Sequence, residues 1–386
     1  MRFTSLAGLG LMVIAAVGAA AQNQVPVLPE KGHLWVVLGA EWSAVVVTGI
    51  RERDKGDLYL WHREQEWQDF RGYFEHIPLD GLACVDGMSW SPNGRDLAFY
   101  EEVDGQVRFC HVRAQEGVAR RIARKGVSYR AWSPNSRYLA FVQKTEGEYR
   151  LRCFPKDTAL APVFDETWEA YEVFDLPALE NRTIAGLQWA PDSSRLLAVA
   201  CVRQPRQQGF KDKILHPALF LTWPGAEEPE IVWQDEQLED HLPRAHWADG
   251  GKLIVFSLEH CTGGYTGVSG PLLGIRPNGT GLRVFWEEPE VKYFELSPDG
   301  QRVLLWLLPG GQWPDGAPEP KRMGAVNLID GTTRLYEEDV VALEPLSRSG
   351  GVTQSIEWAD DCSSVSLFVH GFPDVRDKRR ITLDLP

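Results

Sequence analysis

The residues best suited to bind a charged ligand lie in one short basic stretch. Four basic side chains fall within eleven residues, beside one aromatic residue and a single acid: Arg203, Arg206, Phe210, Lys211, Asp212 and Lys213. The whole chain has a formal net charge of −14, so most of it repels anions. The stretch therefore predicts capture of a carboxylate or phosphate group. The alternative is that these bases only neutralise acids of adjoining loops, because exposed ion pairs are common and contribute little.

Aromatic rings and imidazoles occur in three further polar stretches. An exposed ring beside polar groups can stack on a sugar or anchor a peptide. The alternative is that Tyr265 and Trp313 hold their own loops in place. The candidate ligand-binding residues are therefore Arg203, Arg206, Phe210, Lys211, Lys213, His260, Tyr265, Trp313 and His370.

Four histidines are candidate metal ligands, since imidazole is a common ligand of transition metals. They are His241, His246, His260 and His370. The alternative, which we favour, is four separate surface histidines. The sequence contains no G-x-S-x-G nucleophile elbow, no H-E-x-x-H, no Walker A motif and no paired zinc cysteines. We expect no metal, no cofactor and no catalytic residue.

A repeated element must position these residues. Residues 131–141 (AWSPNSRYLAF) recur as residues 89–99 (SWSPNGRDLAF) and again over residues 188–199, with weaker copies at 247–250, 296–300 and 358–361. Each copy predicts a short strand, a Pro-Asn or Pro-Asp turn and an apolar returning strand. Proline presets φ for the turn, and Asn, Asp or Gly accepts its unusual dihedral angles.

The spacing of the copies, about 40 to 60 residues, is typical of a β-propeller in which each repeat is one blade of four antiparallel strands. A degenerate copy begins near Leu34, so the chain predicts an all-β propeller of seven blades, with six blades as the alternative. The last blade is one strand short. Residues 24–28 are predicted to supply its outer strand and so to close the ring.

The Trp-Ser-Pro-Asn/Asp-Gly/Ser repeat resembles that of TolB-like, WD-related propellers of exported bacterial proteins. The resemblance implies the fold, and it implies roles as binding platforms, as caps on peptidases and occasionally as enzymes. Oligogalacturonate lyases are propellers of similar size that carry a Gln-x-x-His-x-His metal signature. In residues 354–359 of this chain both of those histidines are missing, which counts against the lyase function.

Loop lengths predict where a ligand binds. The loops between second and third strands are short in blades one to three. They are long in blades four to six, at residues 201–217, 259–272 and 309–322, and blade seven adds residues 370–378. Long loops on a rigid scaffold are usually binding sites, so we predict a binding rim over blades four to seven. Neutral variation in loop length is the alternative.

The N-terminus predicts export. Residues 1–21 combine one positive charge, an apolar run and an Ala-x-Ala end, as in a secretory signal peptide cleaved near Ala21. Residues 22–386 then form a single propeller domain, periplasmic or secreted, with no further membrane span. Its acidic charge argues against nucleic acid as a partner. Six cysteines without a C-x-x-C motif predict buried thiols rather than a disulfide scaffold or zinc site.

The predicted function is a monomeric, non-enzymatic binding or scaffolding module for a protein, peptide or anionic glycan. The alternative is a lyase or hydrolase that cleaves a glycan or peptide in the axial cleft.

Overall fold

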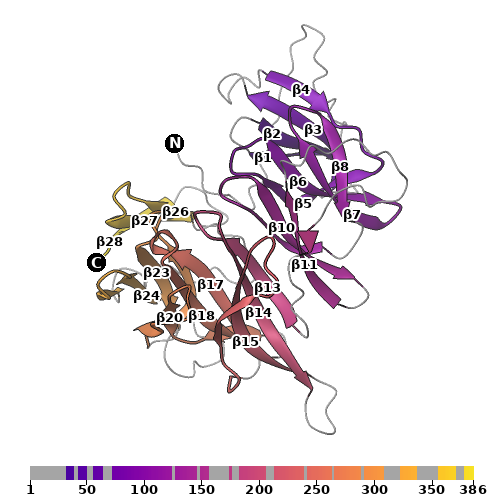
Figure 1. The fold of residues 1–386 in the computed structure, drawn as a ribbon. Helices are drawn as coiled ribbons and strands as arrows, with labels where there is room; N and C mark the ends of the chain where they lie inside the picture. The colour runs from indigo at the N-terminus through magenta and orange to yellow at the C-terminus, as the bar shows by residue number, and fades with distance from the viewer. Residues whose placement is uncertain are drawn as a thin grey trace. The chain divides into compact units, whose positions relative to one another are not determined.

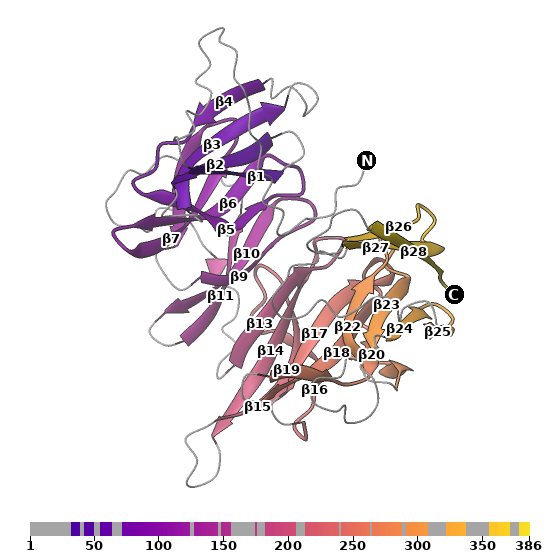
Figure 2. The same cartoon turned by 180° about the vertical axis from the view of Figure 1, so that it is seen from behind.

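The structure is a computed structural model of the chain. It describes residues 32–38, 42–49, 55–63, 72–123, 127–145, 148–155, 174–175, 182–205, 213–238, 241–262, 265–287, 291–307, 322–336, 355–370 and 378–386. The chain divides into two compact units, Met1–Ala178 and Leu179–Pro386, and each is described by itself. The indigo and purple strands in Figures 1 and 2 belong to the first unit, and the magenta to yellow strands belong to the second.

The N-terminal unit contains two sheets, and the larger one consists of two antiparallel four-stranded meanders. The first meander is β1 (Gly32–Leu38), β2 (Trp42–Gly49), β3 (Lys55–Arg63) and β4 (Gly72–His76). The second is β5 (Leu82–Trp90), β6 (Asp96–Val103), β7 (Gln106–Arg113) and β8 (Val118–Ala123). Two residue pairs, Lys55↔Cys84 and Gly56↔Ala83, join β3 to β5. The smaller sheet is β9 (Val127–Trp132), β10 (Tyr138–Thr145), β11 (Glu148–Pro155) and β12 (Phe174–Asp175).

The C-terminal unit contains four sheets with the same consecutive pairing. The first is β13 (Arg182–Trp189), β14 (Leu196–Pro205), β15 (Lys213–Thr222) and β16 (Glu230–Gln234). The second is β17 (His241–Ala248), β18 (Leu253–Thr262), β20 (Leu272–Ile275) and β21 (Arg283–Trp286), with β19 (Tyr265–Ser269) added to β18. The third is β22 (Val291–Leu296), β23 (Arg302–Leu307), β24 (Arg322–Asn327) and β25 (Thr333–Tyr336). The last is β26 (Ser355–Trp358), β27 (Ser364–His370) and β28 (Lys378–Asp384).

This series of four-stranded antiparallel sheets confirms the predicted all-β fold and its four-stranded repeat. In the part of the chain that the structure describes, the only helical segment is the 3₁₀ turn η2 (Asp249–Gly251). None of the described helical structure has the length and apolarity needed to cross a membrane.

The predicted turns form, and their side chains explain the repeat. Ser133 Oγ donates to Asn135 Oδ1 (2.7 Å) and accepts the Tyr138 backbone N–H (2.9 Å), while Asn135 Oδ1 also accepts the Arg137 N–H (2.9 Å). The left-handed backbone falls on the next residue, Ser136, with φ 58°. In this turn the Asn acts through its side chain and the unusual φ falls on a serine, whereas in the copies with glycine, Gly94 and Gly300 take it, as predicted.

The tryptophans of the repeat link neighbouring sheets. Trp132 Nε1 donates to the Ser89 carbonyl (3.2 Å), and Trp247 Nε1 donates to the Gln188 carbonyl (3.2 Å). In both cases the acceptor is the residue just before the equivalent tryptophan, Trp90 or Trp189. Each link thus joins the ends of two first strands at the same offset, which keeps successive sheets in register.

Apolar side chains fill the space between these sheets. In the N-terminal unit, Phe109 of β7 contacts Phe141 of β10 with ring centroids 5.4 Å apart, inside a cluster that includes Phe154. In the C-terminal unit, Leu219 of β15 and Phe256 of β18 belong to one buried cluster. Each fully buried ring or leucine contributes roughly 1.5–3 kcal/mol, so face-to-face packing of sheets is the main source of stability.

The five cysteines whose side chains the structure describes are buried or half-buried free thiols, as predicted. Cys110, Cys153, Cys201 and Cys362 are buried and Cys84 is half-buried. Burial raises the pKa of the Cys153 thiol to about 12. At neutral pH this thiol is therefore protonated and behaves as a small apolar side chain.

Two expectations about strand limits need comment. The stretches at 201–217 and 259–272 were expected to be loops, but β14, β15, β18 and β19 extend into them, so that expectation is wrong at those positions. In the last sheet the described residues provide three strands, one short of the others. The residues predicted to complete it, 24–28, lie outside the described part of the chain.

Candidate functional site

The basic stretch begins on a two-stranded arm. β14 and β15 pair from Leu196↔Thr222 as far as Pro205↔Lys213, whereas β13 pairs with β14 only up to Val202. Among the described strands, the outer strand β16 pairs with β15 only between Ala218 and Leu221. The end of the β14–β15 hairpin therefore extends beyond its own sheet.

The register places two predicted binding residues together. Arg203 lies opposite Leu215, and Pro205 lies opposite Lys213. Directly opposed residues, and residues two apart on one strand, share a face of an antiparallel pair. Arg203 and Lys213 therefore lie on the same face of the arm. Arg206, Phe210 and Lys211 follow in the stretch that the structure does not describe.

A second hairpin extends from the next sheet. β18 continues to Thr262 and pairs with β19 through Thr262↔Tyr265 and Cys261↔Thr266. Tyr265 is thus the first residue of β19, at the end of this hairpin. By contrast, β6 and β7 close tightly at Val103↔Gln106 through Asp104 and Gly105, with φ 50° and 72°. That two-residue turn is the short connection predicted for the second repeat.

The histidines do not form a four-membered set. His241 lies opposite His260 in the β17–β18 ladder, and His246 lies five residues further along β17, opposite Val255. Five residues of strand span roughly 16 Å, so His246 is remote from this pair. His370 ends β27, opposite Lys378, and Trp313 lies outside the described residues. Nowhere in the described ranges do three or more His, Cys, Asp or Glu residues gather as a metal site would require.

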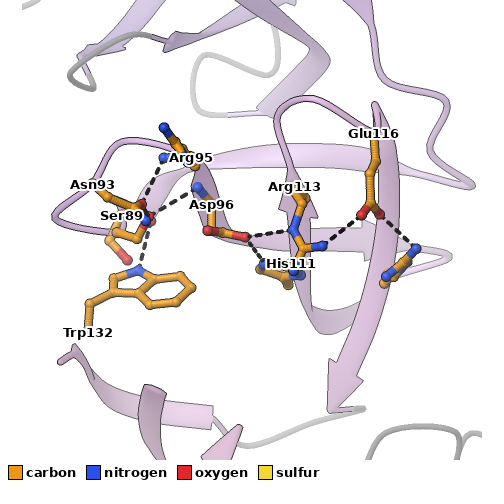
Figure 3. A network of polar contacts seen from close by, with 10 residues as sticks. Ser89, Asn93, Arg95, Asp96, His111, Arg113, Glu116 and Trp132 are labelled. Carbon is orange, nitrogen blue, oxygen red and sulfur yellow. Dashed lines mark hydrogen bonds and ion pairs between the residues drawn. The ribbon is translucent and has the colours of Figure 1, made fainter. Parts of the chain in front are cut away.

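A buried polar network occupies the N-terminal unit (Figure 3). The Asp96 carboxylate is fully buried, with Oδ1 3.1 Å from His111 Nε2 and 3.5 Å from Arg113 Nε. Arg113 also pairs with Glu116 at 2.9 Å. His111 is itself buried against Phe154, with ring centroids 5.3 Å apart. Asp96 and His111 are both buried, so the pair belongs to the interior of the unit.

A pocket of about 450 Å³ opens in the C-terminal unit. It lies where β13, β17 and β22 end and where their turns begin, at the opposite end of β17 from His241. The residues that line it are Gln188, Pro191, His246, Trp247, Ala248, Gly250, Tyr293, Phe294, Glu295, Leu296, Ser297, Pro298, Asp299 and Gly300.

Cross-sheet hydrogen bonds hold the walls of this pocket. The Trp247 backbone N–H donates to Gln188 Oε1 (3.0 Å), in addition to the indole bond to the Gln188 carbonyl. The Asp249 N–H donates to the Gly300 carbonyl (2.9 Å), which joins the turns after β17 and β22. The cavity is thus formed by backbone and side-chain contacts that do not depend on a ligand.

Three titratable side chains in the pocket have perturbed pKa values: His246, Tyr293, whose pKa is raised mainly by burial, and Glu295. Burial, and then the neighbouring Arg244 guanidinium, lowers the pKa of His246. Burial raises the pKa of Glu295, and the hydrogen bond from Trp358 offsets this only in part. Perturbed groups gathered in a cavity are typical of functional sites.

Sequence reasoning placed the site at the long connections and missed this pocket. The sequence analysis did single out one lining residue, His246, but as a candidate metal ligand. A further signal was the alternation of residues 291–296 (VKYFEL), which sets Tyr293 and Glu295 on one face of the strand and Phe294 and Leu296 on the other. That pattern does not reveal that β13 and β17 end beside them.

The comparisons with solved structures concern the fold. Prolyl oligopeptidase B from Galerina marginata aligns with a TM-score of 0.51 and 11% identity, over 92% of this chain and 49% of that one. The β-propeller domain of the Trilobed protease from Pyrococcus furiosus aligns with a TM-score of 0.47 and 13% identity, over 92% of this chain and 93% of that one. TolB from Acinetobacter baumannii aligns with a TM-score of 0.39 and 12% identity, over 92% of this chain and 79% of that one.

A β-propeller domain and a TolB protein are among the similar structures. The chain spans about half the length of the prolyl oligopeptidase it matches, and the likeness concerns the fold and not the activity. No protein-family model matches the sequence, and no curated protein matches it significantly.

Proposed function

We propose that this chain is an exported, seven-bladed β-propeller that acts as a non-enzymatic binding module, with an anion-binding rim formed by its long hairpins. Seven blades follow if each meander of the eight-stranded sheet counts as one blade. The ligand is a protein, peptide or glycan that carries carboxylate or phosphate groups.

The observation that carries this proposal is the paired arm of β14 and β15. Continuous pairing up to Pro205↔Lys213 supports the basic stretch on a strand ladder. In the register of this ladder, Arg203 and Lys213 occupy positions on one face. A site held on strands is positioned more precisely than one on a free loop.

Electrostatics favours an anionic ligand here. The chain carries 54 acidic and 40 basic side chains, so a local excess of bases on an extended hairpin departs from the general charge of the protein. Arginine and lysine bind carboxylate and phosphate through charge-assisted hydrogen bonds, which are about twice as strong as neutral ones.

Reversing both charges tests the proposal. Arg203→Glu with Lys213→Glu is expected to weaken binding of hexagalacturonate or hexaglutamate about tenfold or more at low salt, with a smaller loss at 0.15 M, where the Debye length is about 8 Å. The matched control reverses two exposed bases, Lys252 and Arg276. Lys252 directly precedes β18 and Arg276 directly follows β20, at the end of the sheet away from the β18–β19 hairpin. Isothermal titration calorimetry gives the affinities.

Equal affinity of the double reversal and the control at low salt would refute the anion-binding rim. The same samples test the enzymatic alternative, because a binding module returns the hexamers intact. Shortened products in mass spectra of a wild-type incubation would instead favour a lyase or hydrolase.

A further inference from the structure

The pocket between the ends of β13, β17 and β22 offers hydrogen-bond acceptors and negative charge to a ligand. Two acidic residues, Glu295 and Asp299, line it, and no lysine or arginine does. Asp299 is already used locally, since its Oδ1 accepts hydrogen bonds from Ser297 Oγ and from the Gln301 N–H (3.0 Å). Glu295 is the acid that remains for a ligand.

Glu295 is half-buried, and among the described residues no cation contributes to the shift of its pKa. Among the described residues its hydrogen-bond donor is the Trp358 indole, at 3.4 Å from Oε1. Moving a carboxylate out of water is costly unless a positive charge or several donors compensate it. A long single hydrogen bond compensates only partly, which is why burial still raises the pKa of this group. A ligand cation would supply the missing partner.

The Trp358 contact departs from the pattern of the other sheets. Trp90, Trp132 and Trp247 each donate to a backbone carbonyl of the preceding first strand: Val37, Ser89 and Gln188. Trp358 donates to the side chain at the equivalent position, Glu295. The indole N–H thereby orients the Glu295 carboxyl group. It occupies Oε1 of that group and leaves Oε2 to accept a bond from a second donor.

The other polar groups of the pocket suit a cation as well. Burial and Arg244 lower the pKa of His246, so its imidazole is neutral at pH 7 and accepts a hydrogen bond without repelling a positive charge. The Arg244 guanidinium lies 5.3 Å from the centroid of the Tyr293 ring, which shows that this ring tolerates a cation at its face. Arg244 itself is not among the residues that line the cavity.

We propose that this pocket binds a primary ammonium group, such as that of an aliphatic amine or a lysine side chain, through the Glu295 carboxylate with His246 and Tyr293 at its sides. This site is distinct from the anion-binding rim and does not depend on it. A volume of about 450 Å³ admits a chain of several carbon atoms together with its ammonium group.

Three probes of equal length separate charge from shape: 1,5-diaminopentane, 1,5-pentanediol and glutarate. Calorimetric titration of the wild-type protein at pH 8 is expected to show at least tenfold tighter binding of the diamine than of the other two. This comparison needs no variant. Equal binding of diamine and diol, or no binding of the diamine at millimolar concentration, would overturn the proposal.

Glu295→Gln is the informative substitution, because the amide oxygen still accepts the Trp358 N–H while the charge is lost. It is expected to weaken diamine binding at least tenfold and to leave the thermal midpoint within a few degrees. Glu357→Gln removes an exposed acid from the neighbouring strand β26, outside the pocket, and should leave diamine affinity unchanged. Undiminished diamine binding by Glu295→Gln would refute the site.

The pH dependence has a defined sign. The titratable groups that line the pocket around the bound ammonium are His246 on β17, Tyr293 and Glu295 on β22, and Asp299 in the next turn. Arg244 on β17 lies over the Tyr293 ring, outside this lining. Because the pKa of Glu295 is raised, lowering the pH protonates it early and weakens binding, and a proton on His246 adds repulsion. Affinity should therefore fall from pH 8 to pH 5 in the wild type and change much less in Glu295→Gln.

The Arg203→Glu, Lys213→Glu variant should bind the diamine like the wild type, which separates this test from that of the rim.

Discussion

At the scale of single residues, one indole N–H can decide how two sheets meet. Trp132 is only half-buried, yet its Nε1 bond to the Ser89 carbonyl (3.2 Å) joins β9 to the end of β5. Its ring also packs beside the buried cluster of Phe109, Phe141 and Phe154. These contacts give Trp132 the role of a structural staple between two sheets.

Trp132 substitutions separate the two contributions. Trp132→Phe keeps an apolar ring and loses the hydrogen bond, which should cost about 1 kcal/mol. Trp132→Ala also leaves a cavity and should cost roughly 3–5 kcal/mol. Urea denaturation gives both values, and Tyr129→Phe, on the exposed part of the same strand, should stay within about 0.5 kcal/mol. A fully stable Trp132→Ala protein would contradict the staple role.

The Asp96 network predicts that two substitutions, Asp96→Asn and Glu116→Gln, differ in their cost to stability. Asp96→Asn removes a fully buried negative charge beside His111 and Arg113, and we expect a loss of about 3 kcal/mol, as for other broken buried pairs. Glu116→Gln removes the more exposed partner of the same arginine and should cost about 0–1 kcal/mol. Equal destabilisation in denaturant titrations would show that burial of Asp96 does not matter.

At the scale of elements, the turn after the first strand β22 both reverses the chain and contacts the neighbouring sheet. Gly300 has φ 68°, and its carbonyl accepts the Asp249 N–H from the preceding sheet. A Cβ at Gly300 would lie 3.2 Å from that same nitrogen. At Gly331, with φ 80°, a Cβ would meet nothing within 4 Å.

These two glycines form a matched pair for substitution. Gly331→Ala should cost only the left-handed backbone strain, about 1–2 kcal/mol. Gly300→Ala should cost that amount and more, because it also disturbs the link between the turns of β17 and β22. The thermal midpoint of each variant measures the difference. Identical midpoints would mean that the Asp249–Gly300 contact adds nothing to stability.

At the scale of the whole molecule, the C-terminal strand is tied to the sheet before it. The Arg302 guanidinium donates to the Pro386 carbonyl (2.9 Å), and Arg334 donates to the Asp384 carbonyl (3.2 Å). Yet β28 has a described neighbour on one side only, β27. An unpaired strand edge exposes backbone groups, so a further strand is expected to cover it.

A truncation tests whether residues 24–28 supply that strand. A protein that begins at residue 31 should melt at a temperature lower by about 5 °C or more than one that begins at residue 22. Differential scanning calorimetry of the two proteins gives the comparison. An unchanged midpoint would show that the last sheet is completed in another way.

The sequence by itself determined the repeat: its strands, its turns and their order. The turns depend on bonds between residues at most five positions apart, such as Ser133 with Tyr138, and the strands follow the alternation of apolar residues, so local patterns specify both. Periodic Trp and Pro-Asn pairs were therefore sufficient to predict a propeller of four-stranded sheets.

Only the tertiary structure decided where side chains converge. The pocket brings together Gln188, His246 and Glu295, and the first and last of these are more than a hundred positions apart in the sequence. The face shared by Arg203 and Lys213 follows from the register of β14 and β15. Such positions are set by the stacking of whole sheets, the sum of many weak long-range contacts, and no short window of sequence contains them. For the same reason, the expected loop at 201–217 became a paired arm, since pairing with a partner strand extended β14 and β15 beyond the local pattern.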